Sequence, residues 1–167
     1  QIFFCDQVCI SSNLRNYLEH AQCPQEDSER STKKHVFCEK PLTSTLEESK
    51  ALKEFLSDGQ VLQVGHSERC HKAWEELEEE LKALKGSVTL KIERVAPFKG
   101  RATDVDVVQD LMIHDLDLAM FLLKRKATKV KAYGHKIRTD KNDQVNAIIE
   151  FEDGSVAMIA SGRNHAR

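Results

Sequence analysis

The sequence is poor in glycine and proline, the residues that most often shape tight turns. It holds seven glycines and three prolines among 167 residues, and no glycine occurs before Gly59. Where a backbone must approach a bound phosphate closely, glycine is the usual residue because it has no Cβ. The segment before Gly59 therefore excludes a phosphate-binding loop of the G-x-G-x-x-G type.

Cysteines are also few, and their spacing excludes two classes of small protein. A disulfide framework needs an even number of cysteines, and a zinc ribbon needs C-x-x-C pairs. The five cysteines here are odd in number and scattered: Cys5, Cys9, Cys23, Cys38 and Cys70. We therefore expect reduced thiols and no bound metal.

An excess of charge of one sign is lacking, as are long apolar runs. The chain has 25 lysines and arginines against 27 acidic residues, a net charge of −2, so it has no basic footprint for nucleic acid. No apolar run is long enough to span a bilayer, and the start at residues 1–5 lacks the basic region of a secretory signal. The sequence predicts a cytoplasmic protein with neither a nucleic-acid nor a membrane partner.

The first part of the chain alternates between apolar and polar stretches. An apolar run over residues 2–11 is typical of one short buried parallel strand, and residues 14–21 favour a weak helix. Residues 24–34 are polar without an apolar period, which predicts a loop. Residues 35–38 predict the next strand.

A capping box marks the start of the following helix. Either Ser44 with Glu47 or Thr45 with Glu48 supplies the required pair of side chains. The helix is expected to extend to about Ser57.

Gly59 then fits the stop position of that helix, and residues 61–64 predict another strand. A strand, a helix and a strand in this order predict a parallel crossover unit.

The second half predicts two helices and a sheet. A stripe of tryptophan and leucine over residues 74–84 indicates an amphipathic helix that ends at Gly86, and residues 97–103 indicate a loop. Alternating apolar residues indicate strands, and Asp153-Gly154 indicates a hairpin turn between the last two. The expected strands cover residues 88–93, 129–138, 144–151 and 156–160. We expect a meander packed on a buried helix at residues 107–123.

That buried helix carries one polar face. Asp110, His114 and Asp117 fall within about 60° of one another around a helix axis, given about 100° per residue. Buried carboxylates and imidazoles need partners, because an unpaired buried charge costs several kcal/mol. The helix alone is compatible with an internal hydrogen-bond network or with a catalytic site.

Three motifs, taken in order, resemble the Gfo/Idh/MocA oxidoreductases, a family of NAD(P)-dependent sugar and polyol dehydrogenases. They are Lys34-His35-Val36-Phe37-Cys38-Glu39-Lys40-Pro41-Leu42, then Val64-Gly65-His66 with Arg69, then Asp110-Leu111-Met112-Ile113-His114-Asp115-Leu116-Asp117. The resemblance runs from about residue 34 to the C-terminus. It implies an α/β chain: the C-terminal part of a Rossmann domain at residues 1–68, followed by an incomplete α/β domain at residues 69–167 with an open, mostly antiparallel sheet.

The resemblance also implies catalytic and cofactor-binding residues. Lys40 matches the family lysine near the nicotinamide and the reacting hydroxyl. Asp110 and His114 match the Asp-x-x-x-His pair, with His114 as general acid/base. The cofactor, NAD or NADP, is expected to contact Glu39, Lys40, Pro41 and Ser11.

Expected substrate contacts come from four further residues: His66, Arg94, Arg101 and Asp117. Arginine forks suit a phosphate or carboxylate, so Arg94 and Arg101 favour a phosphorylated or nucleotide-linked sugar. The specific expectation is a nucleotide-sugar 3-dehydrogenase. Surface arginines held only by water are the alternative at both positions. The resemblance further implies association of copies through the open face of the sheet.

Departures from the family pattern leave two other classes open. The glycine fingerprint is absent, and Ser12-Asn13-Leu14 replaces the usual Thr-Pro-Asn turn. An isolated chain of this kind is expected to be a weak or inactive enzyme. A non-catalytic binding or oligomerisation module is one alternative, and a metal-dependent hydrolase is another, with the ligands His66, Cys70, His71 and Asp110.

Overall fold

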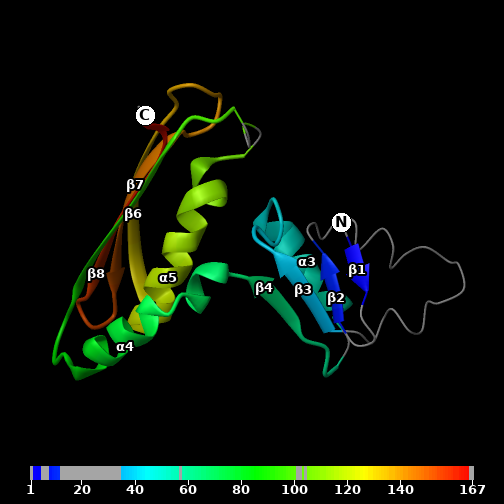
Figure 1. Cartoon of the computed structure of the whole chain (residues 1–167), viewed down its shortest axis with the longest axis horizontal. Coiled ribbons are helices and arrows are strands. Elements are labelled where there is room, and N and C mark those ends of the chain that lie inside the picture. The colour runs from blue at the N-terminus through cyan, green and yellow to red at the C-terminus, as the bar shows by residue number, and fades with distance from the viewer. Residues whose placement is uncertain are drawn as a thin grey trace, which may run out of the picture. The chain divides into compact units, whose positions relative to one another are not determined.

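The structure is a computed structural model that describes residues 2–4, 8–11, 35–56, 58–100, 103 and 105–165 (Figure 1). The chain consists of two compact units, Gln1–His66 and Ser67–Arg167. The expected helix at residues 14–21, the expected loop at residues 24–34 and the side chain of Arg101 lie outside the described residues. The expected domain boundary at residues 68 and 69 stays a prediction.

The first unit contains a four-stranded sheet of order β1-β2-β3-β4. Strand β1 (Ile2–Phe4) is antiparallel to β2 (Val8–Ser11), whereas β2, β3 (His35–Glu39) and β4 (Leu62–Gly65) are parallel to one another. The prediction of a single strand over residues 2–11 is therefore wrong. Polar residues Asp6 and Gln7 interrupt the apolar run, and aspartate favours turns over strand interiors.

Helix α3 (Leu46–Phe55) connects β3 to β4, as the crossover unit requires. Of the two possible capping boxes, the structure has Thr45 with Glu48: the Glu48 N–H donates to Thr45 Oγ1 at 3.2 Å, and the Thr45 N–H donates to Glu48 Oε2 at 3.2 Å. The helix ends at Phe55, earlier than expected. Gly59 does not terminate it directly but lies in the next turn with φ of +80°, a conformation that suits glycine.

The second unit begins with a short 3-10 turn, η1 (Ser67–Cys70), and helix α4 (Ala73–Ala83). Its four-stranded sheet has the order β5-β8-β7-β6. Strand β7 (Gln144–Phe151) is antiparallel to β6 (Ala127–His135) and to β8 (Val156–His165), and β5 (Thr89–Pro97) is parallel to β8. The expected open, mostly antiparallel sheet is confirmed, although β5 and β8 extend further than the sequence predicted.

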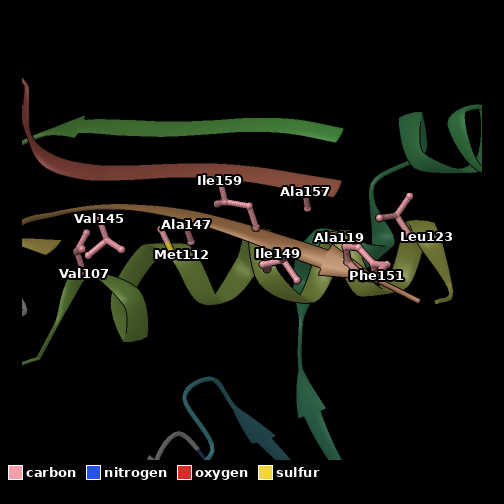
Figure 2. Close-up of a cluster of buried hydrophobic side chains, with 10 residues drawn as sticks. All are labelled: Val107, Met112, Ala119, Leu123, Val145, Ala147, Ile149, Phe151, Ala157 and Ile159. Atoms are coloured by element: carbon pink, nitrogen blue, oxygen red, sulfur yellow. The ribbon is translucent and has the colours of Figure 1, made fainter. Parts of the chain in front are cut away.

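One face of this sheet packs against the buried helix (Figure 2). Alternate residues of β7 are buried, as the period of two predicted. The shared core contains Val107, Met112, Ala119 and Leu123 of the helical segment and Val145, Ala147, Ile149, Phe151, Ala157 and Ile159 of the sheet. This packing holds the polar residues of the helix in fixed positions relative to β5 and β8. No helix among the described residues is long and apolar enough to cross a membrane.

The helix expected at residues 107–123 forms, but its first turn is not α-helical. Residues Val108–Met112 form a π-turn, η2, before helix α5 (Ile113–Leu123). The N–H of Ile113 donates to the carbonyl of Val108, five residues earlier. A π-turn contains more residues per turn than an α-turn, so Asp110 does not point in the direction that a uniform α-helix predicts.

Candidate active site

The carboxyl edge of the first sheet carries one set of the predicted residues. Because β2, β3 and β4 are parallel, their carboxyl ends lie at one edge, where the register pairs Ser11 with Cys38 and Glu39 with Gly65. Lys40 directly follows β3, and His66 directly follows β4. Open parallel sheets bind ligands at this edge.

Glu39 lies close to the backbone of the neighbouring strand. A Cβ added to Gly65 would be 2.9 Å from Glu39 Oε1 and 2.9 Å from Phe37 Cζ. Glycine thus lets this carboxylate lie over β4 at the carboxyl edge. Lys40 is half-buried, and its peptide bond to Pro41 is cis. The side chain of Ser11 lies outside the described part of the structure, so its predicted cofactor contact stays a prediction.

These groups suit one part of a dinucleotide better than another. A carboxylate, an ammonium and an imidazole at the carboxyl edge are suitable partners for ribose hydroxyls and the nicotinamide amide. A pyrophosphate would need the glycine-rich turn, which the sequence lacks. The residues present therefore fit the nicotinamide half of NAD(P).

The second unit carries the polar helix face. Asp110 lies in the π-turn, His114 and Asp117 lie in α5, and all three are half-buried. Asp110 lines a cavity of about 50 Å³. The residues that line this cavity come from the end of β5 and the two residues after it, from the π-turn and from β8: Ala96, Pro97, Phe98, Lys99, Asp110, Leu111 and Arg163.

Asp106 fixes the start of the helix that bears these groups. Its Oδ1 accepts the N–H of Val108 at 3.0 Å, and its Oδ2 accepts the amide of Asn142 at 2.7 Å. The carbonyl of Asn142 in turn accepts the N–H of Val107 at 3.0 Å. The hairpin between β6 and β7 thereby holds the first turn of the helix in place, including the backbone of Asp110, whose N–H donates to the carbonyl of Asp106 at 3.1 Å.

Asp117 pairs with an arginine of the 3-10 turn. Arg69 donates from Nε to Asp117 Oδ2 at 2.7 Å and from Nη2 to Asp117 Oδ1. The hydrogen bond to Asp117 raises the pKa of Arg69 although partial desolvation lowers it, so the guanidinium stays charged. Arg69 also lies 5.5 Å from the centre of the Phe121 ring. This pair ties η1 to α5, and the substrate contact expected of Asp117 stays a prediction.

Asp115 is a buried ion-pair residue that the sequence analysis did not single out. It is fully buried. Arg94 donates to it from Nε at 2.9 Å and contacts it from Nη2 at 2.8 Å, and Ser161 Oγ lies 3.4 Å away. The Arg94 guanidinium also contacts Glu68 at 3.3 Å. Since Arg94 already holds two carboxylates of its own chain, its expected role as a substrate ligand stays a prediction.

The spacing of Asp115 contained a signal for this burial. Asp115 follows Met112 by three residues and precedes Ala119 by four, which is the period of the buried stripe. A carboxylate in such a stripe needs a cation, and arginine is the usual one because its fork binds both oxygens. The helix therefore carries an ion-pair network around Asp115 and, separately, Asp110 beside a cavity. The catalytic role expected of Asp110 and His114 stays a prediction.

A second buried ion pair lies near that cavity. Asp143 is fully buried, and its Oδ2 accepts the N–H groups of Ile137 at 2.9 Å, Arg138 at 2.6 Å and Thr139 at 2.9 Å. Its Oδ1 accepts Nε of Arg163 at 2.9 Å. Burial raises the pKa of Asp143, but these donors together outweigh it, so the pKa lies below the ordinary value of a carboxyl.

The hydrolase alternative receives no support from the described part of the chain. Within it, no group of three or more histidine, cysteine or acidic side chains is arranged to hold a metal ion. Cys70 and His71 are exposed near the end of η1.

Comparison with family models gives a match to each unit. Residues 5–66 match the model described as an oxidoreductase family with an NAD-binding Rossmann fold, and residues 92–167 match the Gfo/Idh/MocA C-terminal domain.

Individual relatives are similar over most of this chain but over less than half of their own length. UDP-N-acetylglucosamine 3-dehydrogenase of Acidithiobacillus ferrooxidans is 39% identical over 77% of this chain and 41% of the relative. The scyllo-inositol 2-dehydrogenase (NAD(+)) of Bacillus subtilis is 30% identical over 78% of this chain and 42% of the relative. A solved structure of the Acidithiobacillus enzyme aligns with a TM-score of 0.71 at 37% identity, covering 84% of this chain and 44% of that one.

The order of the motifs, the two kinds of sheet and the matches to both family models agree. The chain belongs to the Gfo/Idh/MocA family of NAD(P)-dependent oxidoreductases.

Proposed function

We propose that this chain carries the catalytic residues of an NAD(P)-dependent dehydrogenase that oxidises a ring hydroxyl of a sugar. The observation that carries the proposal is the location of the two motifs. Glu39-Lys40-Pro41 follows a parallel strand at its carboxyl edge, and Asp110 and His114 lie at the start of a buried helix, where Asp110 lines a cavity.

The roles follow from the chemistry of alcohol oxidation. Bound NAD(P) supplies the hydride acceptor, and the hydroxyl proton must leave as well. His114 is the proposed general base, because an imidazole titrates near neutrality. Lys40 is the proposed cation that stabilises the developing alkoxide. Asp110 is proposed to orient His114 or to accept a hydrogen bond from the sugar.

The proposed substrate is a nucleotide-linked sugar oxidised at position 3. The similarity to the Acidithiobacillus UDP-N-acetylglucosamine 3-dehydrogenase supports this choice over a free polyol. Identity to the inositol dehydrogenase is lower, at 30% against 39%. A cytoplasmic location is part of the same proposal.

The direct test is a titration of the purified protein with NADH and NADPH, followed by nicotinamide fluorescence. Lys40→Ala is expected to weaken binding about 10- to 100-fold, because it removes a charge-assisted contact worth about 1.5–3 kcal/mol. Lys50→Ala is the matched control, since Lys50 is exposed on α3 in the same unit. Its affinity is expected to equal that of the wild type.

Oxidation of UDP-N-acetylglucosamine and of scyllo-inositol is then measured with NAD+ or NADP+, the oxidised form of whichever cofactor binds more tightly. Saturable cofactor binding with faster turnover of the nucleotide sugar supports the proposal. A folded protein that binds neither NADH nor NADPH contradicts it and favours a non-catalytic module, which the missing glycine fingerprint also allows.

We also propose that two copies associate through the face of the second sheet that α5 does not cover. Ile148 and Met158 are paired neighbours on this face. Val95 of β5 lies on the same face, four positions further along the pairing of β5 with β8; each of the three is more than a third exposed. A row of exposed apolar side chains on a sheet is typical of an interface.

The mutation Ile148→Glu is expected to convert the associated form to a monomer in light scattering, because it places a charge among these apolar side chains. Val130→Glu is the control: Val130 is 63% exposed but pairs with the buried Ile149, so it points to the opposite side of the sheet. A wild-type monomer at high concentration, or equal effects of both changes, would argue against this interface.

A further inference from the structure

Strand β8 changes from apolar to polar along its helix-facing side. The residues on that side are Ala157, Ile159, Ser161 and Arg163, and all four are buried. The first two belong to the hydrophobic core. Ser161 contacts Asp115, and Arg163 lines the cavity that contains Asp110. The polar end of β8 therefore lies beside the π-turn.

Arg163 is held rigidly at this position. Its Nε donates to Asp143 Oδ1 at 2.9 Å, and its Nη2 donates to Thr139 Oγ1 at 3.2 Å. Only 4% of the residue is exposed. Asp143 is itself fixed by three backbone N–H groups. A buried guanidinium fixed in this way has a defined direction for its N–H donors, which is the property a specificity site requires.

The cavity combines apolar and charged lining residues. Pro97, Phe98 and Leu111 contribute apolar surface, and the charged residues are Lys99, Asp110 and Arg163. A carboxylate accepts hydrogen bonds, whereas a guanidinium donates them. Its volume of about 50 Å³ exceeds the space that one water molecule needs, about 10–15 Å³, but suits a substituent better than a whole sugar ring. A hydroxyl group is both donor and acceptor, so it can contact both side chains.

We propose that Arg163 is a specificity-determining residue that donates a hydrogen bond to a sugar hydroxyl next to the reacting carbon, while Asp110 accepts from the same hydroxyl. The inference rests on the proposed function and adds a substrate requirement to it. In a sugar oxidised at position 3 and carrying an N-acetyl group at position 2, the neighbouring hydroxyl is the one at position 4.

The test compares UDP-N-acetylglucosamine with its 4-deoxy analogue in the wild type, in Arg163→Met and in Arg163→Lys. The wild type is expected to prefer the parent sugar in kcat/KM by about 10- to 100-fold, because the analogue lacks a charge-assisted hydrogen bond worth about 1.5–3 kcal/mol. Arg163→Met is expected to lower kcat/KM for the parent more than for the analogue, so that the preference falls by about threefold or more while the contact with Asp110 remains. Arg163→Lys keeps the cation beside Asp143 and is expected to retain part of the preference.

A purely structural role for Arg163 predicts a different result. Both substrates would then lose rate by the same factor, which overturns the inference while leaving the proposed function intact. Equal use of the two sugars by the wild type overturns it in the same way, and that comparison needs no variant to fold. If the folded, cofactor-binding wild type turns over neither sugar, the proposed substrate is wrong and this inference fails with it.

Discussion

Replacing Asp143 by alanine is expected to lower the free energy of unfolding by about 3–5 kcal/mol, the range found when one partner of a buried ion pair is removed. The change leaves Arg163 buried without its carboxylate. It also removes the acceptor of three backbone N–H groups in the connection between β6 and β7. These N–H groups then lose a charged acceptor, and a hydrogen bond to a charged group contributes about 1.5–3 kcal/mol.

Urea unfolding followed by circular dichroism measures this loss. Asp140→Ala is the matched control, because Asp140 is an exposed carboxylate in the same connection. It is expected to change the free energy of unfolding by no more than about 0.5 kcal/mol. A loss below about 1.5 kcal/mol for Asp143→Ala would mean that water replaces the carboxylate without a large penalty, contrary to the burial of both partners.

The same substitution carries a defined pH dependence. The pKa of Asp143 is lower in the folded state than in the unfolded state, where a carboxyl titrates near 3.9. Its contribution is therefore complete above about pH 5 and declines as the pH falls through the unfolded and then the folded value. The stability difference between wild type and Asp143→Ala is expected to be constant from pH 5 to 8 and to narrow below about pH 4.

The elements that could be predicted from the sequence are those in which a local pattern and tertiary packing require the same residues. The alternation of β7 predicted its buried face because one side of the strand packs against α5. The box formed by Thr45 and Glu48 predicted the start of α3, since its two hydrogen bonds are local. The family motifs predicted both kinds of sheet.

Features that depend on distant partners could not be predicted in this way. The π-turn around Asp110 is held by hydrogen bonds that Asn142 donates to Asp106, a residue 36 positions away in the chain. From the sequence, Arg94 was a candidate ligand for a phosphate. In the structure its guanidinium binds the buried carboxylate of Asp115. The sequence did not predict a site role for Arg163, because its partner Asp143 and most residues of the cavity that it lines belong to other elements.

Replacing His114 by glutamine is expected to lower kcat about 10²- to 10⁴-fold for the sugar substrate, the usual contribution of a general base. Glutamine keeps the approximate size and hydrogen-bonding capacity of the side chain but cannot accept a proton. His114 lies in the second unit, whereas the proposed cofactor residues lie in the first. NADH affinity is therefore expected to stay within about twofold of the wild type, and the loss appears in kcat rather than in cofactor binding.

His71→Gln is the control for this substitution, because His71 is exposed and lies in the same unit. It is expected to leave kcat unchanged. If His114 is needed for folding rather than for proton transfer, His114→Gln lowers both NADH affinity and thermal stability. These two measurements therefore separate loss of a base from loss of structure. If His114→Gln keeps more than about a tenth of wild-type kcat, another group must accept the hydroxyl proton. Asp110 is then the next group to test, because its carboxylate lies beside the cavity that Arg163 also lines.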